Sequence, residues 1–437
     1  MLSTIADAGA GTSGKRSRLN TFIIAGTLVA VLIVIFVINR VNSDPVMPLQ
    51  EPVAEVNQVV PIVEPGTTVP MEQPPDLWLQ AYGSSSGNAA WGHPVVAPFD
   101  TLWTISTGKE IFSTPAFVGD MIFLAGNDKI LRGINRDSGL QEWSRTVTCG
   151  LSGGVAADST TVYFSGQDGY VYALNRETGS ERWKTGLGFH VFTDACIFCD
   201  SLVLAGNSAG SIAALNKENG SLIWSDTMEG LLLGPAVSDS IAVFTSEAGS
   251  AGAWDLSGNS IWSRGFTSQP SPPSIGSGLV FIGFSTGKVL ALSLQTGETI
   301  WETALERVQG RAVVSRPALV GDSLLVAGTC DGRVFCLETG NGELVWEAQF
   351  ENWISVTPAV CDTIVYASCD DNRIHLLSLN TGFPIDAIET GSYSGTSPVI
   401  IEGVLYTGNA AGDFTAIRGT SPHNRAMEEE EIICPVE

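Results

Sequence analysis

The chain has 437 residues, of which 46 are Asp or Glu and 22 are Lys or Arg, so its formal net charge is −24. This acidity argues against nucleic acid or anionic lipid as a partner of the main domain, because both are polyanions. The length alone would allow two or three ordinary domains. An internal repeat that covers most of the sequence indicates a single one instead.

The N-terminal segment predicts a membrane anchor. Residues 19–39 carry no charge and, at about 1.5 Å per residue, are long enough to cross a hydrocarbon core of about 30 Å. Lys15, Arg16 and Arg18 precede this stretch and outweigh the single cation after it. The positive-inside rule then predicts that 1–18 is cytoplasmic and that the protein spans the cell (inner) membrane once, with its main domain periplasmic or extracellular. A cleaved signal peptide is the alternative, although the apolar run is long for one.

The segments on either side of the main domain have biased compositions. Residues 40–75 are rich in Pro, Val and Glu, which favours an extended, semi-rigid tether. We expect the globular domain to span 76–420 and to open with an aromatic lead-in at 77–92. The C-terminal 421–437 is acidic, and we expect it to be disordered.

The stretch 173–183, ALNRETGSERW, recurs imperfectly along the chain. Each copy reads as a strand, a hairpin loop closed by Gly and a returning strand that ends at Trp. Two further short strands precede each copy, so the unit has four strands and no helical period, which is typical of a propeller blade. We expect each Trp ring to dock against the neighbouring unit. The predicted docking residues are Trp103, Trp143, Trp183, Trp224, Trp262, Trp301 and Trp346, with Gly139, Gly179, Gly220, Gly297 and Gly342 in the hairpins.

The units can be counted from the sequence. Eight groups of inner strands are recognisable, but the last one, 398–418, has no outer strand, and Asp386 replaces the Trp of the unit before it. Residues 101–105 form a surplus outer strand at the other end, and placing it in the last unit removes two exposed sheet edges. The predicted fold is therefore all-β: an eight-bladed propeller with four-stranded blades, closed by an N-terminal strand, preceded by one transmembrane helix and monomeric.

The repeated pattern Ala-x-Asp-x-x-Thr-Gly-x-x-x-Trp resembles the tryptophan-docking motif of PQQ-binding-like propellers over roughly 76–420. Within that superfamily, the size of the chain resembles the BamB family, scaffold subunits of the outer-membrane β-barrel assembly machinery. The resemblance implies a non-catalytic scaffold that binds an envelope protein and needs no cofactor. The chain departs from that family in lacking a lipidation Cys after the apolar run. The family's Asp-x-Asp docking pair corresponds here to 314–316, Val-Ser-Arg, so that contact is not carried over.

A PQQ-dependent dehydrogenase or a small-ligand-binding sensor propeller is the alternative. Quinoprotein dehydrogenases resemble this chain in their blade motif but carry an adjacent cysteine pair and a calcium site. The chain has no adjacent cysteines, no acidic cluster where the inner strands begin, and no Gly-x-Ser-x-Gly elbow. We therefore predict that the protein is not an enzyme.

The eight cysteines are interpreted mostly as free thiols that replace small apolar residues. Equivalent positions in neighbouring blades are too far apart for a disulfide. The spacing Cys196-x-x-Cys199 suggests zinc, but no second pair accompanies it, and side chains at i and i+3 of a strand point to opposite faces. No metal site is predicted.

The loops that precede the inner strands form the candidate partner-binding face. One of them, 302–316, is about five residues longer than the repeat requires, and lengthened loops on a rigid scaffold tend to carry binding sites. Arg and Trp most often carry interface energy, and exposed apolar side chains are candidate anchors. The predicted contact residues are Arg311, Arg316, Trp353, Leu232 and Phe189. The alternative is that the apolar ones pack over the core.

Overall fold

The computed structural model describes the residues 77–78, 88–148, 150, 153–191, 193–198, 201–238, 240–305 and 313–419. The chain divides into two compact units, 1–57 and 58–437, and every described residue belongs to the second. The expected membrane span 19–39, the tether and the acidic tail lie outside the described residues. Within the described part, no helix has the length and apolarity needed to span a membrane.

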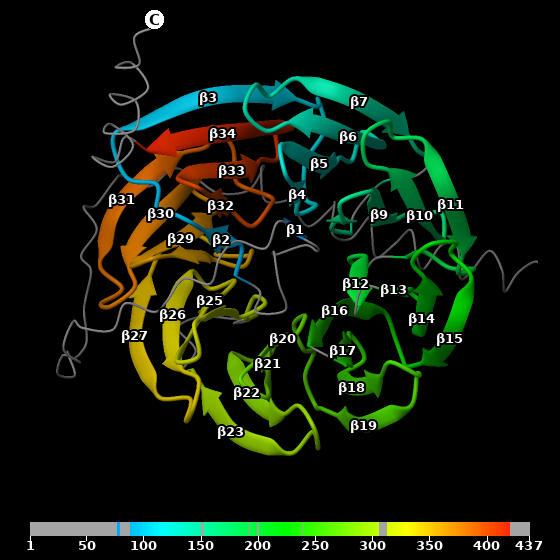
Figure 1. Ribbon diagram of the computed structural model, residues 1–437. Helices are drawn as coiled ribbons and strands as arrows, with labels where there is room; N and C mark the ends of the chain where they lie inside the picture. The colour runs from blue at the N-terminus through cyan, green and yellow to red at the C-terminus, as the bar shows by residue number, and fades with distance from the viewer. Residues whose placement is uncertain are drawn as a thin grey trace, which may run out of the picture. The chain divides into compact units, whose positions relative to one another are not determined.

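The described residues form eight sheets arranged around a central axis (Figure 1), which confirms the eight-bladed propeller. The strands of blades 1 to 4 are β4 (Ala116–Val118), β5 (Met121–Ala125), β6 (Ile130–Asn135), β7 (Gln141–Thr146); β8 (Ala156–Ala157), β9 (Thr161–Ser165), β10 (Tyr170–Asn175), β11 (Glu181–Gly186); β12 (Cys196–Phe198), β13 (Leu202–Gly206), β14 (Ser211–Asn216), β15 (Leu222–Thr227); and β16 (Leu232–Ser238), β17 (Ile241–Ser246), β18 (Ser250–Asp255), β19 (Ser260–Gly265). The strands of blades 5 to 8 are β20 (Ser274–Gly276), β21 (Leu279–Gly283), β22 (Lys288–Ser293), β23 (Thr299–Ala304); β24 (Ala318–Val320), β25 (Leu324–Gly328), β26 (Arg333–Glu338), β27 (Leu344–Gln349); β28 (Ala359–Cys361), β29 (Ile364–Cys369), β30 (Arg373–Ser378), β31 (Pro384–Glu389); and β32 (Val399–Ile401), β33 (Val404–Gly408), β34 (Asp413–Gly419), β3 (Phe99–Ser106).

Two blades carry a fifth strand next to their inner strand. β1 (Leu77–Trp78) pairs antiparallel with β4, and β2 (Ala90–Trp91) pairs parallel with β32. Every blade thus has the four strands that we predicted, and the aromatic lead-in adds the two extra ones. The sequence pattern did not predict that β2 pairs with β32, because β2 is not part of the repeat.

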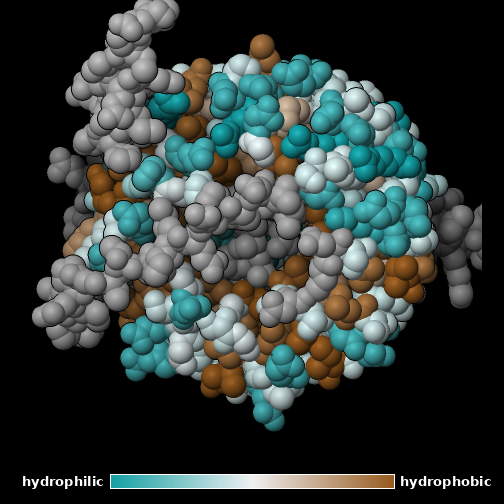
Figure 2. All heavy atoms as spheres, in the orientation of Figure 1, coloured by the Kyte–Doolittle hydropathy of each residue, from teal (hydrophilic) through white to brown (hydrophobic). Residues whose placement is uncertain are grey.

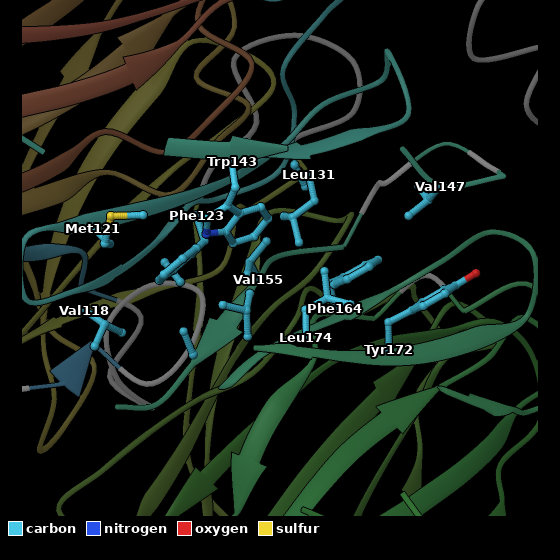
Figure 3. Close-up of a cluster of buried hydrophobic side chains, with 14 residues drawn as sticks. Val118, Met121, Phe123, Leu131, Trp143, Val147, Val155, Phe164, Tyr172 and Leu174 are labelled. Atoms are coloured by element: carbon cyan, nitrogen blue, oxygen red, sulfur yellow. The ribbon is translucent and has the colours of Figure 1, made fainter. Parts of the chain in front are cut away.

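The hydrophobic core lies between neighbouring blades. In β5, Met121, Phe123 and Ala125 pack toward blade 2, whereas Ile122 and Leu124 pack toward blade 8. This alternation follows from the period of two along a strand, and it explains why the middle strands are apolar on both faces. Figure 3 shows the cluster between blades 1 and 2, to which both blades contribute aromatic and aliphatic side chains. Each of the eight blade junctions holds one such cluster.

Each docking Trp reaches from its own blade to the hairpin of the next. The Nε1 group of Trp183 donates to the carbonyl oxygen of Lys217 at 2.9 Å, and its ring lies over Gly220. A Cβ at Gly220 would lie 2.5 Å from a ring carbon of Trp183, so the hairpin has no room for a side chain. The same pairing joins Trp103 to Gly139, Trp143 to Gly179, Trp224 to Gly258, Trp262 to Gly297, Trp301 to Gly342 and Trp346 to Gly382. Sequence reasoning missed Gly258, which lies in a copy of the repeat that is one residue shorter (253–262), and Gly382, which lies in the copy that ends at Asp386 instead of Trp (376–386).

Closure of the ring explains why Asp386 replaces a Trp. The outer strand of blade 8 is β3, which pairs with β34 from the opposite end of the chain. This confirms the predicted N-terminal closing strand. Because β34 and β3 are not consecutive in the sequence, blade 8 has no hairpin between its two outermost strands, and it therefore lacks the hairpin glycine on which a Trp from blade 7 could dock. The docking residue of blade 7 therefore has no target, and an exposed Asp386 stands in its place.

The segment 88–96 replaces the missing dock at the junction of blades 7 and 8. Val95 is fully buried in the core of that junction. The Tyr366 hydroxyl accepts a hydrogen bond from the Val95 N–H at 2.7 Å and donates one to the Val95 carbonyl at 2.8 Å. The side-chain amide of Asn88 makes two hydrogen bonds with the backbone of Val360, at 2.8 and 2.9 Å. We call residues 88–96 the strap.

Candidate functional site

The strands of each blade alternate in direction, so its connections gather on two opposite faces. The loop face consists of the segments that precede the inner strands and of the turns between the second and third strands. The hairpin face carries the docking glycines. In every blade, a backbone N–H of the turn donates to one carbonyl of the preceding loop, at 2.8–3.4 Å. The eight acceptors are Glu110, Gly150, His190, Leu231, Gln269, Val313, Trp353 and Tyr393.

This repeated bond places Trp353 on the loop face. The Trp353 carbonyl accepts from the N–H of Asp370 at 3.0 Å, so its backbone is fixed in the same way as in the other blades. Its side chain is half-buried. Trp353 therefore combines a rigid backbone with a partly accessible ring.

Other aromatic side chains of the loop face are more exposed. Phe189 is 60% exposed, as the prediction of a partner contact requires, and Phe112 and Tyr170 are 42% and 37% exposed. The Lys184 ammonium lies 3.8 Å from the centre of the Tyr170 ring, a cation–π contact. Sequence reasoning did not identify Phe112. This residue lies two positions after the acceptor Glu110.

Leu232 is a correction. We expected it to be an exposed anchor, but it is only 1% exposed. It comes directly after the acceptor Leu231, and this next position is filled by a buried side chain in the other blades that the structure describes there. Ile111, Val191, Val314 and Ile354 occupy it and are at most 1% exposed. Aligning the loops would have shown that Leu232 closes the end of its blade.

Arg316 is a second correction, because it lies inside the ring and not on its surface. Its side chain is buried, with 5% exposed, and its Nε donates to the Ser274 hydroxyl of blade 5 at 3.3 Å. It lies two residues before the first residue of the inner strand β24. The same position holds Asp194 in blade 3, whose carboxylate accepts from the N–H of Gly154 in blade 2. From the sequence, we expected no acidic cluster where the inner strands begin, and we assigned Arg316 to the partner-binding face.

Asp194 and Arg316 influence each other electrostatically. Burial raises the pKa of the Asp194 carboxyl, while the Gly154 N–H and the positive charge of Arg316 act in the opposite direction. A Cβ at Gly234 of blade 4 would lie 3.3 Å from the Asp194 carboxylate. Residues from blades 2 to 6 thus meet around one acid and one base close to the axis.

Arg311 and the middle of the lengthened loop, 306–312, lie outside the described residues, which resume at 313. The end of that loop is fixed, because Val314 is buried and bridges to Thr329. The predicted role of Arg311 stays a prediction.

The described cysteines are free thiols, as expected. Burial raises the pKa of Cys196, Cys336, Cys361 and Cys369 to about 12. These thiols are therefore protonated at neutral pH and are poor nucleophiles. Cys196 lies in β12, and Cys199 lies outside the described residues.

A further apolar surface, which the sequence analysis did not identify, follows the outer rim. The residue before each docking position is aliphatic and exposed in blades 3 to 8, but it is Glu142 in blade 1 and Arg182 in blade 2. The aliphatic members are Leu102, Ile223, Ile261, Ile300, Val345 and Ile385, each 37–54% exposed. Figure 2 shows apolar patches over β15, β19 and β23 and a hydrophilic surface over blades 1 and 2. We call these six residues the rim arc.

Comparison with known proteins fits this architecture. The family model described as outer membrane protein assembly factor BamB matches residues 100–190, 193–384 and 310–422. The chain belongs to this family. BamB of Yersinia pestis is 24% identical over 307 residues, which is 67% of this chain and 61% of that protein. BamB of Nitrosomonas eutropha is 27% identical over 231 residues, which is 51% of this chain and 46% of that protein. The chain thus spans about half to three-fifths of the length of these relatives.

Solved structures agree in fold. BamB from Moraxella catarrhalis has a TM-score of 0.63 at 19% identity and covers 73% of this chain and 99% of that chain. The quinohemoprotein alcohol dehydrogenase from Comamonas testosteroni has a TM-score of 0.64 at 12% identity and covers 79% and 81%. Since BamB and an alcohol dehydrogenase match equally well, fold likeness alone does not assign a function.

Proposed function

We propose that the protein is a non-catalytic scaffold that takes part in the assembly of outer-membrane proteins by binding another envelope protein through its loop face. The observation that carries this proposal is the match to the BamB family model from residue 100 to residue 422. The relatives that match are named outer membrane protein assembly factors.

The geometry of the loop face supports the choice of surface. Phe112, Tyr170 and Phe189 are exposed there, and Trp353 is half-buried, on loops whose backbones are pinned by the repeated hydrogen bond. Exposed aromatic side chains on a rigid frame lose little conformational entropy on binding, and they are the usual anchors of protein interfaces. The hairpin face is built from docked glycine turns that resemble one another from blade to blade, so it offers less to distinguish a partner.

The proposal includes a membrane tether. Residues 19–39 would anchor the chain in the inner membrane, with residues 1–18 in the cytoplasm and the propeller outside it. Sequencing the N-terminus of the mature protein tests the anchor, since a start beyond residue 40 would show that the segment is removed.

Photo-crosslinking in native membranes tests the choice of face. A photoreactive amino acid replaces Phe189 or Phe112 on the loop face, Leu140 on the hairpin face, or Ile300 in the rim arc; all four side chains are exposed. We expect one envelope protein to crosslink from the loop-face positions only. Crosslinking from Leu140 or Ile300, with none from Phe189 and Phe112, would contradict the proposal. Dye reduction by the purified protein with PQQ and Ca²⁺ would instead support the dehydrogenase alternative.

A further inference from the structure

Three possible metal ligands meet on the loop face of blade 7. They are the Cys369 thiol at the end of β29, the Asp371 carboxylate in the following turn and the His375 imidazole in β30. One ligand atom from each lies within 4.8 Å of the other two. Among the described residues, no other such group of three occurs.

The surroundings of the three side chains suit an ion that is bound at the surface. Cys369 is 1% exposed, and the side chains of His375 and Asp371 are 14% and 27% exposed. The group therefore has a buried side, formed by the thiol, and a side open to water. The Phe350 ring lies against the imidazole, with 4.5 Å between ring centres, and limits the orientations that it can adopt.

In blades 1 and 6, the equivalent turn holds a carboxylate that pairs with a guanidinium. In blade 6, Asp331 binds the Arg333 guanidinium at 2.9 Å. In blade 1, Asp128 pairs with Arg132. A guanidinium is permanently protonated and cannot ligate a metal, so these turns are complete without an ion.

Blade 7 lacks this pairing of a turn carboxylate with a guanidinium. The Arg373 backbone N–H donates to the Asp371 carboxylate at 3.1 Å, but the Arg373 side chain binds Glu389 instead, with 2.8 Å between Nε and the carboxylate oxygen. The Asp371 carboxylate instead faces Nε2 of His375 at 2.8 Å, a nitrogen that ligates metals when it is neutral. The thiol is also particular to this blade, since Thr329 stands at the position of Cys369 in blade 6.

We propose that Cys369, Asp371 and His375 bind one Zn²⁺ ion, with water as the fourth ligand. Thiolate, imidazole and carboxylate are the donors that zinc takes in proteins, and the thiolate disfavours Mg²⁺ and Ca²⁺. Binding of the ion displaces the proton of the Cys369 thiol, which is released to the solvent. Ligand atoms around tetrahedral zinc lie roughly 3.3–3.6 Å apart for bond lengths of about 2.0–2.3 Å. The widest present separation, 4.8 Å, needs to shorten by about 1 Å, which side-chain rotation in one turn can supply. The bound ion would join β29 to β30 beside the turn that holds the Trp353 carbonyl.

Zinc titration of the full-length chain, purified in detergent after treatment with a chelator, tests the proposal by calorimetry. We expect one Zn²⁺ per chain, lost in Cys369→Thr and in His375→Phe. The two substitutions introduce the residues that blade 6 carries at the equivalent positions, Thr329 and Phe335. We therefore expect both variants to fold, and circular dichroism checks this. Cys330→Ser is the matched control, because it removes a half-buried thiol from the neighbouring turn without touching the group, and it should keep the site.

Cobalt gives a second measurement that needs no variant. Co²⁺ bound to the wild-type chain should show thiolate-to-cobalt charge-transfer absorption, which zinc displaces. Equal zinc binding by the wild type and both folded variants would show that zinc binds elsewhere on the chain and would overturn the proposal. The absence of saturable zinc binding, or a cobalt complex without charge-transfer absorption, would also overturn it.

Discussion

At the scale of single residues, the ring is held together by seven Trp–Gly contacts between neighbouring blades. The ring of each Trp packs against the hairpin of the next blade. Its N–H donates to a backbone carbonyl of that hairpin, at a distance of at most 3.0 Å. The glycine is needed for two separable reasons. Its φ is positive, and its missing side chain leaves room for the ring.

Two alanine substitutions separate these reasons. Gly220 and Gly391 have nearly the same φ, 70° and 71°, but a Cβ would meet Trp183 at Gly220 and nothing within 4 Å at Gly391. Gly391→Ala should cost roughly 1–2 kcal/mol for the left-handed backbone. Gly220→Ala should cost about 1–3 kcal/mol more, because the ring must move. Chemical denaturation measures both, and equal costs would show that docking adds no steric demand.

Asp194 predicts a pH effect on stability. Burial raises the pKa of its carboxyl in the folded state above the ordinary value of 3.8, against the opposing influence of Gly154 and Arg316. The folded state therefore holds this proton more tightly than the unfolded state, and the resulting stabilisation is lost as the pH rises through the folded pKa. Asp194→Asn removes the titration, so the melting temperature of the variant relative to the wild type should rise as the pH increases above the ordinary carboxyl pKa of 3.8. A difference that does not change with pH would contradict this.

At the scale of elements, the junction of blades 7 and 8 is built differently from the other seven. It has no Trp dock, and the strap and β3 join it from the far end of the chain. The strap contributes Val95 to the core of the junction, and β2 extends the sheet of blade 8. The ring is therefore closed by two adjacent N-terminal segments rather than by the outer strand alone.

Truncations distinguish the two closing segments. Removing residues 1–87 should leave a folded propeller, because the strap and β3 remain. Removing 1–97 takes the strap and exposes the core around Val95, so the melting temperature should fall. Removing 1–110 also takes β3 and leaves blade 8 with an open edge, which should prevent cooperative melting. Calorimetry of the three chains measures this series, and identical melting of all three would refute both closing roles.

At the scale of the whole molecule, the periodic features were predictable and the features that join distant segments were not. Recurrence of Trp indicated the blades, and the surplus strand around Trp103 indicated the closure. Nothing periodic marks the strap, because Val95 meets Tyr366 across the closing junction. Leu232 and Arg316 were misplaced because loop residues were judged by type. Comparison with Ile111 would have placed Leu232 at the end of its blade, and comparison with Asp194 would have placed Arg316 among the buried residues close to the axis.

The central claim is that the loop face binds a partner. The most direct test is to measure the affinity of the chain for the envelope protein identified by crosslinking. Trp353→Ala keeps the backbone bond to Asp370 and should weaken binding by about 1–3 kcal/mol, the usual cost at an aromatic anchor, with little change in melting temperature. Ile300→Ala in the rim arc should leave the affinity unchanged. If Trp353→Ala instead lowers the melting temperature sharply and binds as tightly per folded molecule, or if Ile300→Ala is the variant that weakens binding, the partner does not bind at the loop face.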